Sequence, residues 1–195
     1  MSTPISESAI ATLPQRPKRA DAARNYDKLI AAARAAFTED GASASLEDIA
    51  RRAGVGIGTL YRNFATRQEL LEAVYVEEVE TICRAAEEAD GADPWEALAS
   101  WLRSFAGYAA TKKALMTELM EYMDGSAPVF THCRQAIGDA GEPLLAAAQR
   151  AGVVREDIVF MDMVRMVGGI AAIPNAEPGQ VDRILTVALD GLRRR

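Results

Sequence analysis

Residues 45–64 read SLEDIARRAGVGIGTLYRNF, two short segments with helical apolar spacing on either side of a glycine-rich turn. In the first segment Ser45 can cap a helix, and apolar residues recur at three- and four-residue steps until Gly54 ends it. The turn is Gly-Val-Gly at 54–56, and a second short helix is predicted over residues 57–63. Two short helices joined by such a turn form the helix-turn-helix plan.

The second of these helices has one side suited to packing and one side suited to DNA. Val55, Leu60 and Phe64 form the packing side. The DNA major groove is roughly 12 Å wide and admits one helix, which reads bases with residues near its N-terminus. By spacing alone, plain packing inside a helical protein is the alternative. The residues that we expect to contact DNA are Ser45, Gly56, Ile57, Gly58, Thr59, Tyr61, Arg62, Asn63 and Arg67.

The chemistry of these side chains predicts different contacts. The hydroxyls of Thr59 and Tyr61 can donate to phosphates. Arg62 can form the bidentate pair with guanine that is the commonest specific contact with a base. Arg67 is predicted in the first turn of the next helix, where its charge opposes the helix dipole, so a partner anion such as a phosphate would explain it.

Residues 46–71 closely resemble the DNA-binding head of TetR-family transcriptional regulators. The recurring pattern of that family is Ile-Ala-x-x-Ala-Gly-Val, then Gly-Thr-Leu-Tyr-x-x-Phe, then Lys or Arg with a following Leu. These elements stand here as IARRAGV at 49–55, GTLYRNF at 58–64 and RQELL at 67–71. The resemblance implies that the helix over 57–63 enters the major groove.

The resemblance also implies roles for single residues. It puts Thr59 and Tyr61 where phosphate contacts are usual, and Arg67 where a basic residue clamps the DNA backbone. The variable, base-reading positions hold Ile57, Gly58 and Arg62. Asn63 stands where an aromatic residue or histidine is common, and Gly-Ile at 56–57 replaces a more usual polar pair. The operator sequence therefore cannot be taken from relatives.

The balance of charge differs between the two parts of the chain. The 195 residues carry a net charge of −6, which by itself argues against a nucleic-acid partner. Residues 1–65, however, carry nine Lys and Arg against seven Asp and Glu, a balance of +2, whereas residues 66–195 carry thirteen against twenty-one, a balance of −8. We therefore expect any contact with DNA in the front third.

Composition argues against several classes of protein. No apolar run approaches the roughly 18 to 20 residues of a membrane-spanning helix, and the first twenty residues lack the apolar core of a secretory signal, so we expect a cytoplasmic protein with no membrane partner. Cys83, Cys133 and the one histidine, His132, are too few for a disulfide framework or a metal cluster. There is no Gly-x-Ser-x-Gly and no phosphate-binding glycine loop. We expect no enzyme, no cofactor and no metal.

The whole chain is predicted to be all-α, with about nine helices, because no segment alternates with a period of two. Three domains are expected: a disordered arm over 1–20, a three-helix DNA-binding head over 21–66, and a helical ligand-binding and dimerisation domain over 67–195. Helices outside the motif are predicted over about 21–40, about 66–88, from 94 to a break at 111–113, from there to 124, from 128 with a kink or split at 141–143, about 157–173 and about 178–194.

Basic residues near the N-terminus leave two interpretations open. Arg16, Lys18, Arg19 and Arg24 can reach into a minor groove, as basic arms do. A solvated tail is the favoured interpretation.

The central helices of the back two thirds concentrate large, pliable apolar side chains. Methionine-rich walls adapt to varied apolar ligands, although the residues alone favour an ordinary core. The family resemblance implies a small-molecule pocket there. Its expected lining is Trp101, Phe105, Tyr108, Met116, Met120, Met123, Phe130, Met163 and Met166, and possible polar anchors are Arg103, Glu118, His132, Asp162 and Arg165.

The last two predicted helices are suited to pairing with a second copy. Small residues let another backbone approach closely, and the final apolar stripe is too broad for a lone exposed terminus. The residues expected at this interface are Gly168, Gly169, Ala172, Val181, Ile184, Leu185, Ala188 and Leu192. Such pairing gives a twofold homodimer and predicts a palindromic operator with half-sites about one DNA turn apart.

Together these expectations describe a ligand-responsive transcriptional regulator with three partners: a double-stranded DNA operator, a second copy, and an unidentified small-molecule effector. The favoured form is a repressor that a small apolar or amphipathic ligand releases from DNA. Such release requires that the ligand bind the two states of the protein unequally. The alternative is a helical small-molecule-binding or interaction module that does not read DNA.

Overall fold

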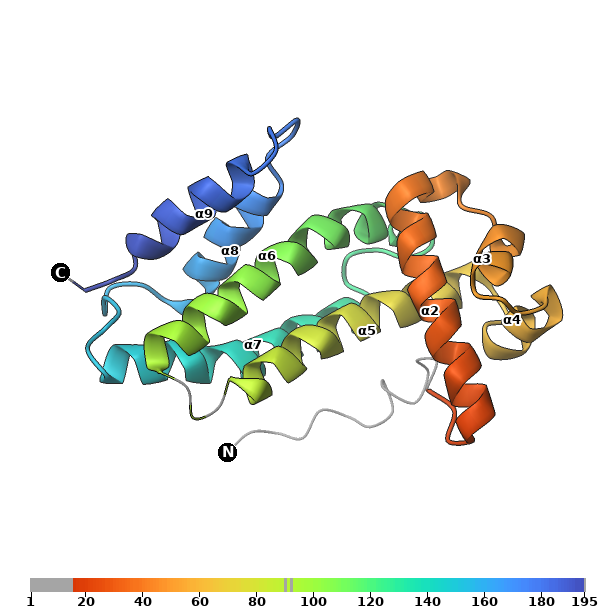
Figure 1. Cartoon of the computed structure of the whole chain (residues 1–195), viewed down its shortest axis with the longest axis horizontal. Helices are drawn as coiled ribbons and strands as arrows, with labels where there is room; N and C mark the ends of the chain where they lie inside the picture. The colour runs from red at the N-terminus through yellow and green to blue at the C-terminus, as the bar shows by residue number, and fades with distance from the viewer. Residues whose placement is uncertain (1–15, 90, 92, 195) are drawn as a thin grey trace. The chain divides into compact units, whose positions relative to one another are not determined.

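The computed structural model describes residues 16–89, 91 and 93–194, which form an all-α fold (Figure 1). The predicted fold class is confirmed. Within these residues the elements are α2 (Ala20–Asp40), the 3-10 turn η1 (Gly41–Ser43), α3 (Leu46–Arg52), α4 (Ile57–Asn63), α5 (Arg67–Glu88), α6 (Pro94–Leu119), α7 (Pro128–Arg150), α8 (Phe160–Ala171) and α9 (Gln180–Asp190). Residues 1–15 of the predicted arm lie outside the described part of the chain. None of the described helices combines the length and the apolar character needed to cross a membrane.

The predicted break at 111–113 is wrong, because α6 runs through it to Leu119. The segment contains no proline or glycine, and the Thr111 hydroxyl donates back to the Gly107 carbonyl at 3.3 Å, as a serine or threonine inside a helix does. Tyr108 and Leu115 are buried on either side of it. Packing on both flanks therefore favours one continuous helix.

Of the kink or split predicted at 141–143, the split is wrong, because α7 continues unbroken across Pro143. Proline removes one backbone donor from the helix, which costs stability. Ile137, Leu145 and Ala148 are nevertheless buried before and after it, so tertiary packing holds both halves in one helix.

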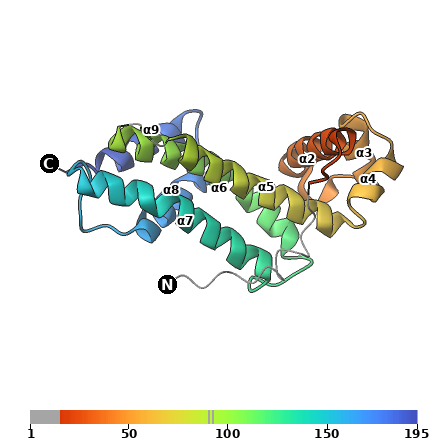
Figure 2. The same cartoon turned by 90° about the horizontal axis from the view of Figure 1, so that it is seen from below.

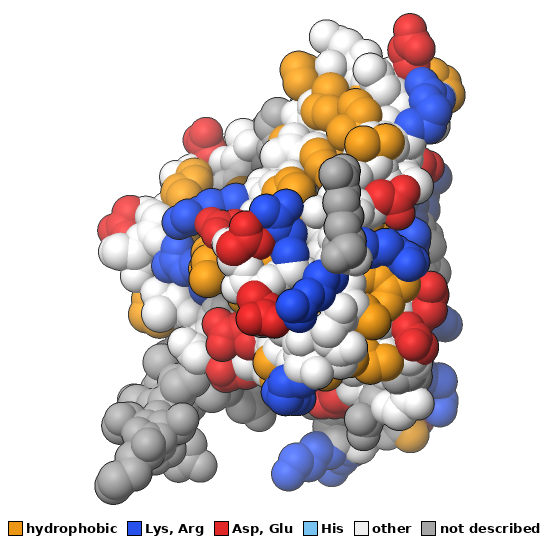
Figure 3. Space-filling model, turned by 90° about the vertical axis from the view of Figure 1, so that its left-hand side faces the viewer, with side chains coloured by type: hydrophobic (Ala, Val, Ile, Leu, Met, Phe, Trp, Pro, Cys, Tyr) orange, Lys and Arg blue, Asp and Glu red, His pale blue; other side chains and the backbone are white. Residues whose placement is uncertain are grey.

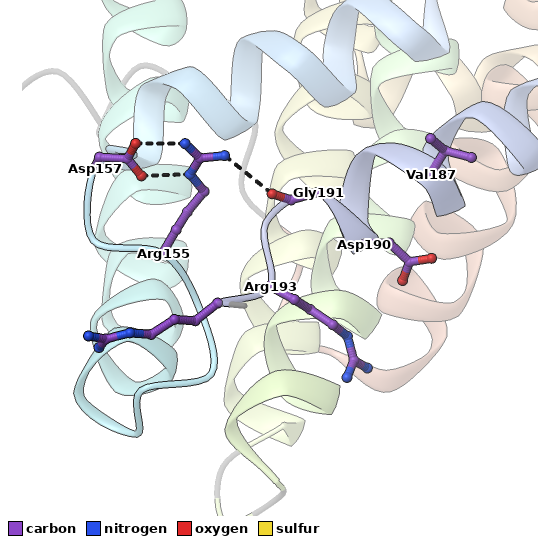
Figure 4. A pocket seen from close by; sticks show the side chains of 7 residues that line it. Arg155, Asp157, Val187, Asp190, Gly191 and Arg193 are labelled. Atoms are coloured by element: carbon purple, nitrogen blue, oxygen red, sulfur yellow. Dashed lines mark hydrogen bonds and ion pairs between the residues drawn. The ribbon is translucent and has the colours of Figure 1, made fainter.

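The last two helices are shorter than predicted, and backbone pairing explains one of the ends. Val154 and Arg193 form an antiparallel bridge, the only extended pairing in the described residues. The amide of Arg155 donates to the Leu192 carbonyl at 3.0 Å, and the amide of Arg194 donates to the Val153 carbonyl at 3.1 Å. These bonds take the end of the chain out of helical geometry. The Arg155 guanidinium also holds Asp157 and reaches the Gly191 carbonyl (Figure 4).

The described residues divide into two compact units, and the boundaries fall inside α5, α6 and α7. The first unit holds the described residues up to Glu77 together with 114–133; the second holds 78–113 and 134 onward. In the first unit α2 packs on α3 and α4 (Figure 1). Its core contains fully buried Leu29, Phe37, Ile49 and Leu60.

The core of the second unit is built around Trp101 of α6. The Trp101 ring lies 5.6 Å from the Phe105 ring and 5.7 Å from the Phe160 ring, measured between centroids. Its indole N–H donates to the Ile82 carbonyl of α5 at 3.1 Å. Within this unit α6 therefore lies beside α5, and Figure 2 shows α7 running along the same group of helices.

Gly141 of α7 is needed for close packing in this core. A Cβ atom added there would lie 2.4 Å from Phe160 and 2.6 Å from Trp101. The absent side chain thus lets two aromatic rings approach the α7 backbone.

We predict that Gly141→Ala lowers the free energy of unfolding by about 1–3 kcal/mol, because overpacking displaces the aromatic rings. Gly138→Ala, one turn earlier in α7, is the matched control, since its added Cβ comes no closer than 3.9 Å to the Glu142 carboxylate. The control should gain about 0.5–1 kcal/mol from helix propensity. Urea unfolding measures both, and equal stabilities for the two variants would contradict the packing described here.

Candidate nucleic-acid interface

The first helix of the motif is capped as its sequence predicts. The Ser45 hydroxyl oxygen accepts from the Asp48 amide at 3.0 Å, which satisfies one of the free amides at the start of α3. Ile49 and Ala50 are buried under the helix. Ser45 lies at the edge of the motif with its hydroxyl engaged in this cap, and its contact with DNA stays a prediction.

The turn between α3 and α4 depends on a left-handed backbone at Gly54, where φ is +67°. Only glycine adopts this conformation without cost. The Val55 amide then donates to the Ala50 carbonyl at 3.0 Å, which closes the turn. Leu60 and Phe64 of the returning chain are fully buried, and the Phe64 ring lies 5.2 Å from the Tyr26 ring of α2.

The opposite side of α4 is open. Ile57 and Tyr61 are 37% and 48% exposed although both are large and hydrophobic. Cβ atoms added at Gly56 or Gly58 would meet nothing within 4 Å, so the backbone is accessible there. Arg62 is exposed and donates to the Thr59 hydroxyl at 2.7 Å. Of the predicted DNA-facing residues of α4, Ile57, Gly58, Tyr61 and Arg62 therefore share one solvent-exposed side, whereas Thr59 and Asn63 are half-buried.

Two predicted DNA contacts are turned onto the protein itself. The Asn63 amide group donates to the Thr59 carbonyl at 2.8 Å inside α4. Arg67 donates to the Ala44 carbonyl, to the Gly41 carbonyl at 3.2 Å and to the Glu118 carboxylate at 3.4 Å. The partner anion that the sequence requires for Arg67 is thus a carboxylate of this chain.

Charges beside the motif tie α3 to the end of α2. Arg52 pairs with Asp48 at 2.5 Å, with Glu39 at 2.5 Å and with Asp40 at 3.4 Å, and Arg51 also binds Asp48. Partial burial raises the pKa of Asp48, but the hydrogen bonds from the two arginines outweigh it and hold that pKa below its ordinary value. The Arg51 side chain stays 80% exposed.

The residues predicted to line a ligand pocket fall into two groups. In the second unit Trp101, Phe105, Tyr108 and Met163 are buried, with Met166 half-buried. In the first unit Phe130 is buried, Met116 and Met123 are half-buried, and Met120 is 47% exposed. Packing of ring against ring links the first three of these residues, since Phe105 lies 5.6 Å from Trp101 and 5.5 Å from Tyr108.

Three cavities within the described residues have other linings. One of about 470 Å³ lies among α6, α8 and α9, and Arg103, a predicted polar anchor, lines part of it. The small residues one turn apart in α6 were not predicted to line a cavity. It is lined by Arg103, Ala106, Gly107, Ala110, Ala171, Val181, Asp182, Leu185 and Thr186. Another of about 610 Å³ lies between α5 and α7 at Cys83, whose thiol has its pKa raised by burial and by nearby carboxylates. A third, of about 710 Å³, lies at the end of α9 (Figure 4).

The predicted dimer residues lie on α8 and α9 or at the ends of these helices. The two helices pack on each other. Leu185 and Leu192 are buried within the chain itself. The others are half-buried or exposed: Gly168, Gly169, Ala172, Val181, Ile184 and Ala188. Val159, Met161 and Val187 are 61%, 44% and 73% exposed. On the face drawn in Figure 3, hydrophobic side chains gather in the upper part, above a region of mixed charges.

Comparison with known families matches both parts of the chain. Residues 29–74 match the family described as bacterial regulatory proteins, tetR family. Residues 93–194 match the C-terminal domain of SbtR-like transcriptional regulators.

Solved structures give the same result. The chain is 41% identical to a TetR transcriptional regulator from Streptomyces coelicolor, with a TM-score of 0.76 over 86% of this chain and 98% of that one. It is 36% identical to a TetR transcription regulatory protein from Mycobacterium vanbaalenii, with a TM-score of 0.73 over 91% of this chain and 100% of that one. A TetR-family regulator from Haemophilus influenzae, 18% identical with a TM-score of 0.60 over 90% and 100%, shares the fold.

We predict that Asp48 titrates below the usual range for aspartate, as measured by NMR of its side-chain carboxyl. Because its pKa is lower in the folded chain than in the unfolded chain, ionised Asp48 stabilises the head above the unfolded-state pKa. This contribution is lost as the pH falls through the folded-state pKa. Arg52→Ala should raise the pKa toward its usual value, whereas Arg155→Ala, in the second unit, should leave it unchanged. An ordinary pKa in the wild-type protein would refute the arrangement.

Proposed function

The chain belongs to the TetR family of bacterial transcriptional regulators, and we propose that it is a repressor that binds a palindromic operator as a homodimer. Members of this family are DNA-binding regulators and not enzymes, with a helix-turn-helix domain and a ligand-binding C-terminal domain. We further propose that a small apolar or amphipathic ligand releases the protein from DNA. Operator binding would place its action in the cytoplasm, where the bacterial chromosome lies.

The observation that carries the proposal is the two-sided character of α4. Leu60 and the following Phe64 are fully buried, while Ile57, Tyr61 and Arg62 are exposed on the other side. Among the residues that the structure describes, none covers this outer side of α4. We assign the Tyr61 hydroxyl to a phosphate and the Arg62 guanidinium to a guanine edge.

The proposed homodimer rests on the exposed apolar side chains of α9 and of the start of α8. Val187 is 73% exposed and Val159 is 61% exposed, which is costly for a surface that always faces water. We assign the contact to the half-buried and exposed members of the predicted set, above all Val181, Ile184 and Ala188. A twofold pair would hold two copies of α4 for two operator half-sites.

We assign the effector site to the aromatic row of Trp101, Phe105 and Tyr108. Met163, which is also in the lining predicted from the sequence, is assigned to the same site. These side chains are buried and in the second unit, and their large apolar area suits an apolar or amphipathic molecule. The rings are packed against each other, so the ligand must displace them to enter. A ligand that requires such a rearrangement binds the two states of the protein unequally, as release requires.

Selection of binding sites from random double-stranded DNA, at near-physiological salt, tests the proposal. We expect enrichment of a palindrome with half-sites about one DNA turn apart. The enriched duplex then permits a search for ligands by release of the protein. If folded, ligand-free protein enriches no sequence, the chain is instead a small-molecule-binding or interaction module that has kept the fold of the head without its reading function.

We predict that Arg62→Ala and Tyr61→Phe have different effects on the enriched duplex. Loss of a bidentate base contact should reduce discrimination at one base pair in each half-site by about 1–3 kcal/mol. Loss of a phosphate contact by Tyr61→Phe should weaken binding to all sequences alike. Arg51→Ala is the matched control, since it removes the same charge from α3 and should leave base preference unchanged. Competition assays with single-base variants of the duplex measure this, and uniform weakening by Arg62→Ala would remove it from base reading.

A further inference from the structure

Glu118, near the C-terminal end of α6, is 7% exposed and is the one buried charged residue among those the structure describes. A buried carboxylate is costly unless it is paired and hydrogen-bonded. It lies in the first unit, with the DNA-binding head, although it falls within residues 93–194, which match the C-terminal domain. A charge from the C-terminal domain is therefore embedded beside the head.

The partner of Glu118 is Arg67, the first residue of α5, at 3.4 Å. The Arg67 side chain is 19% exposed, and its guanidinium carbon lies 4.9 Å from the centre of the Phe37 ring. The same guanidinium donates to the carbonyls of Gly41 and Ala44, which begin and end the connection from α2 to α3. One cation thus joins three elements: the end of α2, the start of α5 and the end of α6.

The carbonyls that Arg67 binds lie at the two ends of the 41–44 connection. Gly41 follows directly after α2. The Ala44 amide donates to the Gly41 carbonyl at 3.1 Å, and the next residue is the Ser45 cap of α3. The position of this connection therefore sets where α3 begins, and α4 follows α3 after a tight turn.

We propose that Glu118 is a positioning residue for DNA binding: it holds Arg67 on the 41–44 connection and thereby fixes the placement of α3 and α4. Arg67 then acts inside the protein and not on a DNA phosphate. This inference rests on the proposed function as a DNA-binding regulator. It also gives the last turn of α6 a direct influence on the head, because removal of the carboxylate takes a counter-charge away from a largely buried guanidinium.

The first test compares Glu118→Gln with Glu121→Gln on the duplex enriched by site selection. Both variants remove one negative charge from neighbouring positions, but Glu121 is exposed. Glu121→Gln should bind as well as the wild-type protein or slightly better. Glu118→Gln should bind about tenfold more weakly, as expected for loss of a charge-assisted contact. Equal affinities for the two variants would overturn the proposal.

The salt dependence of binding shows whether Arg67 acts on the protein or on DNA. Arg67→Met keeps an unbranched stem over Phe37 and removes the charge. A phosphate contact contributes about 0.9 to the slope of log K against log salt concentration. We expect weaker binding by Arg67→Met with an unchanged slope, and no further weakening when Glu118→Gln is added. A slope reduced by about 1.8 for Arg67→Met, about 0.9 for each copy in the proposed dimer, would show a phosphate contact and refute the inference.

Amide hydrogen exchange in the free protein tests the ion pair without DNA. Glu118→Gln should accelerate exchange of the Ala44 amide several-fold, because the 41–44 connection loses its anchor, whereas Glu121→Gln should not. If this amide is unaffected while the wild-type protein binds the duplex, the positioning role fails and the proposed function stands. If exchange behaves as expected but the wild-type protein binds no duplex, the ion pair stands as a structural contact, and the proposed function fails together with the role in DNA binding.

Discussion

A seven-residue helix such as α4 cannot persist by its own hydrogen bonds, and this constraint shapes the whole head. Its stability has to come from one buried side, which leaves the other side free. Leu60 and Phe64 supply that side: α4 packs on α2, and the Phe64 ring lies against the Tyr26 ring of α2. The Gly54 turn is then required to bring the chain back at the angle that permits both contacts.

Local signals in the sequence predicted most of the head, and long-range packing explains what they missed. The cap at Ser45 and the turn at Gly54 depend on residues within a few positions, so both can be predicted from the sequence. The continuity of α6 and α7 depends on buried neighbours from other helices, which overrode the apparent break and the proline at 143. The exposed side of α4 follows from helical spacing, but the set predicted from the sequence also included Thr59 and Asn63, which are half-buried.

The anion that pairs with Arg67 could not be predicted in the same way. Its position at the start of a helix indicates that it needs an anion, and a phosphate and a carboxylate satisfy that need equally well. The carboxylate belongs to Glu118, which is 51 positions away in the sequence. Helical periodicity carries no information about a partner at that distance. The predicted pocket lining contains one buried row of rings and several more exposed methionines. Helical periodicity could not distinguish the two groups, because their burial depends on helices distant in the sequence.

The tight packing of that row bears on how a ligand would act. Trp101 contacts Phe105 in its own helix and Phe160 in α8. The rings of Trp101 and Phe160 lie so close to Gly141 that no space remains there for even a methyl group. A ligand that enters there must move rings and therefore helices, and α6 is one unbroken helix from Pro94 to Leu119, with Glu118 in its last turn. If ligand binding lowers the affinity for the operator by some factor, operator binding lowers the affinity for the ligand by the same factor. The same α6 that carries Trp101 thus also carries the carboxylate that holds the head.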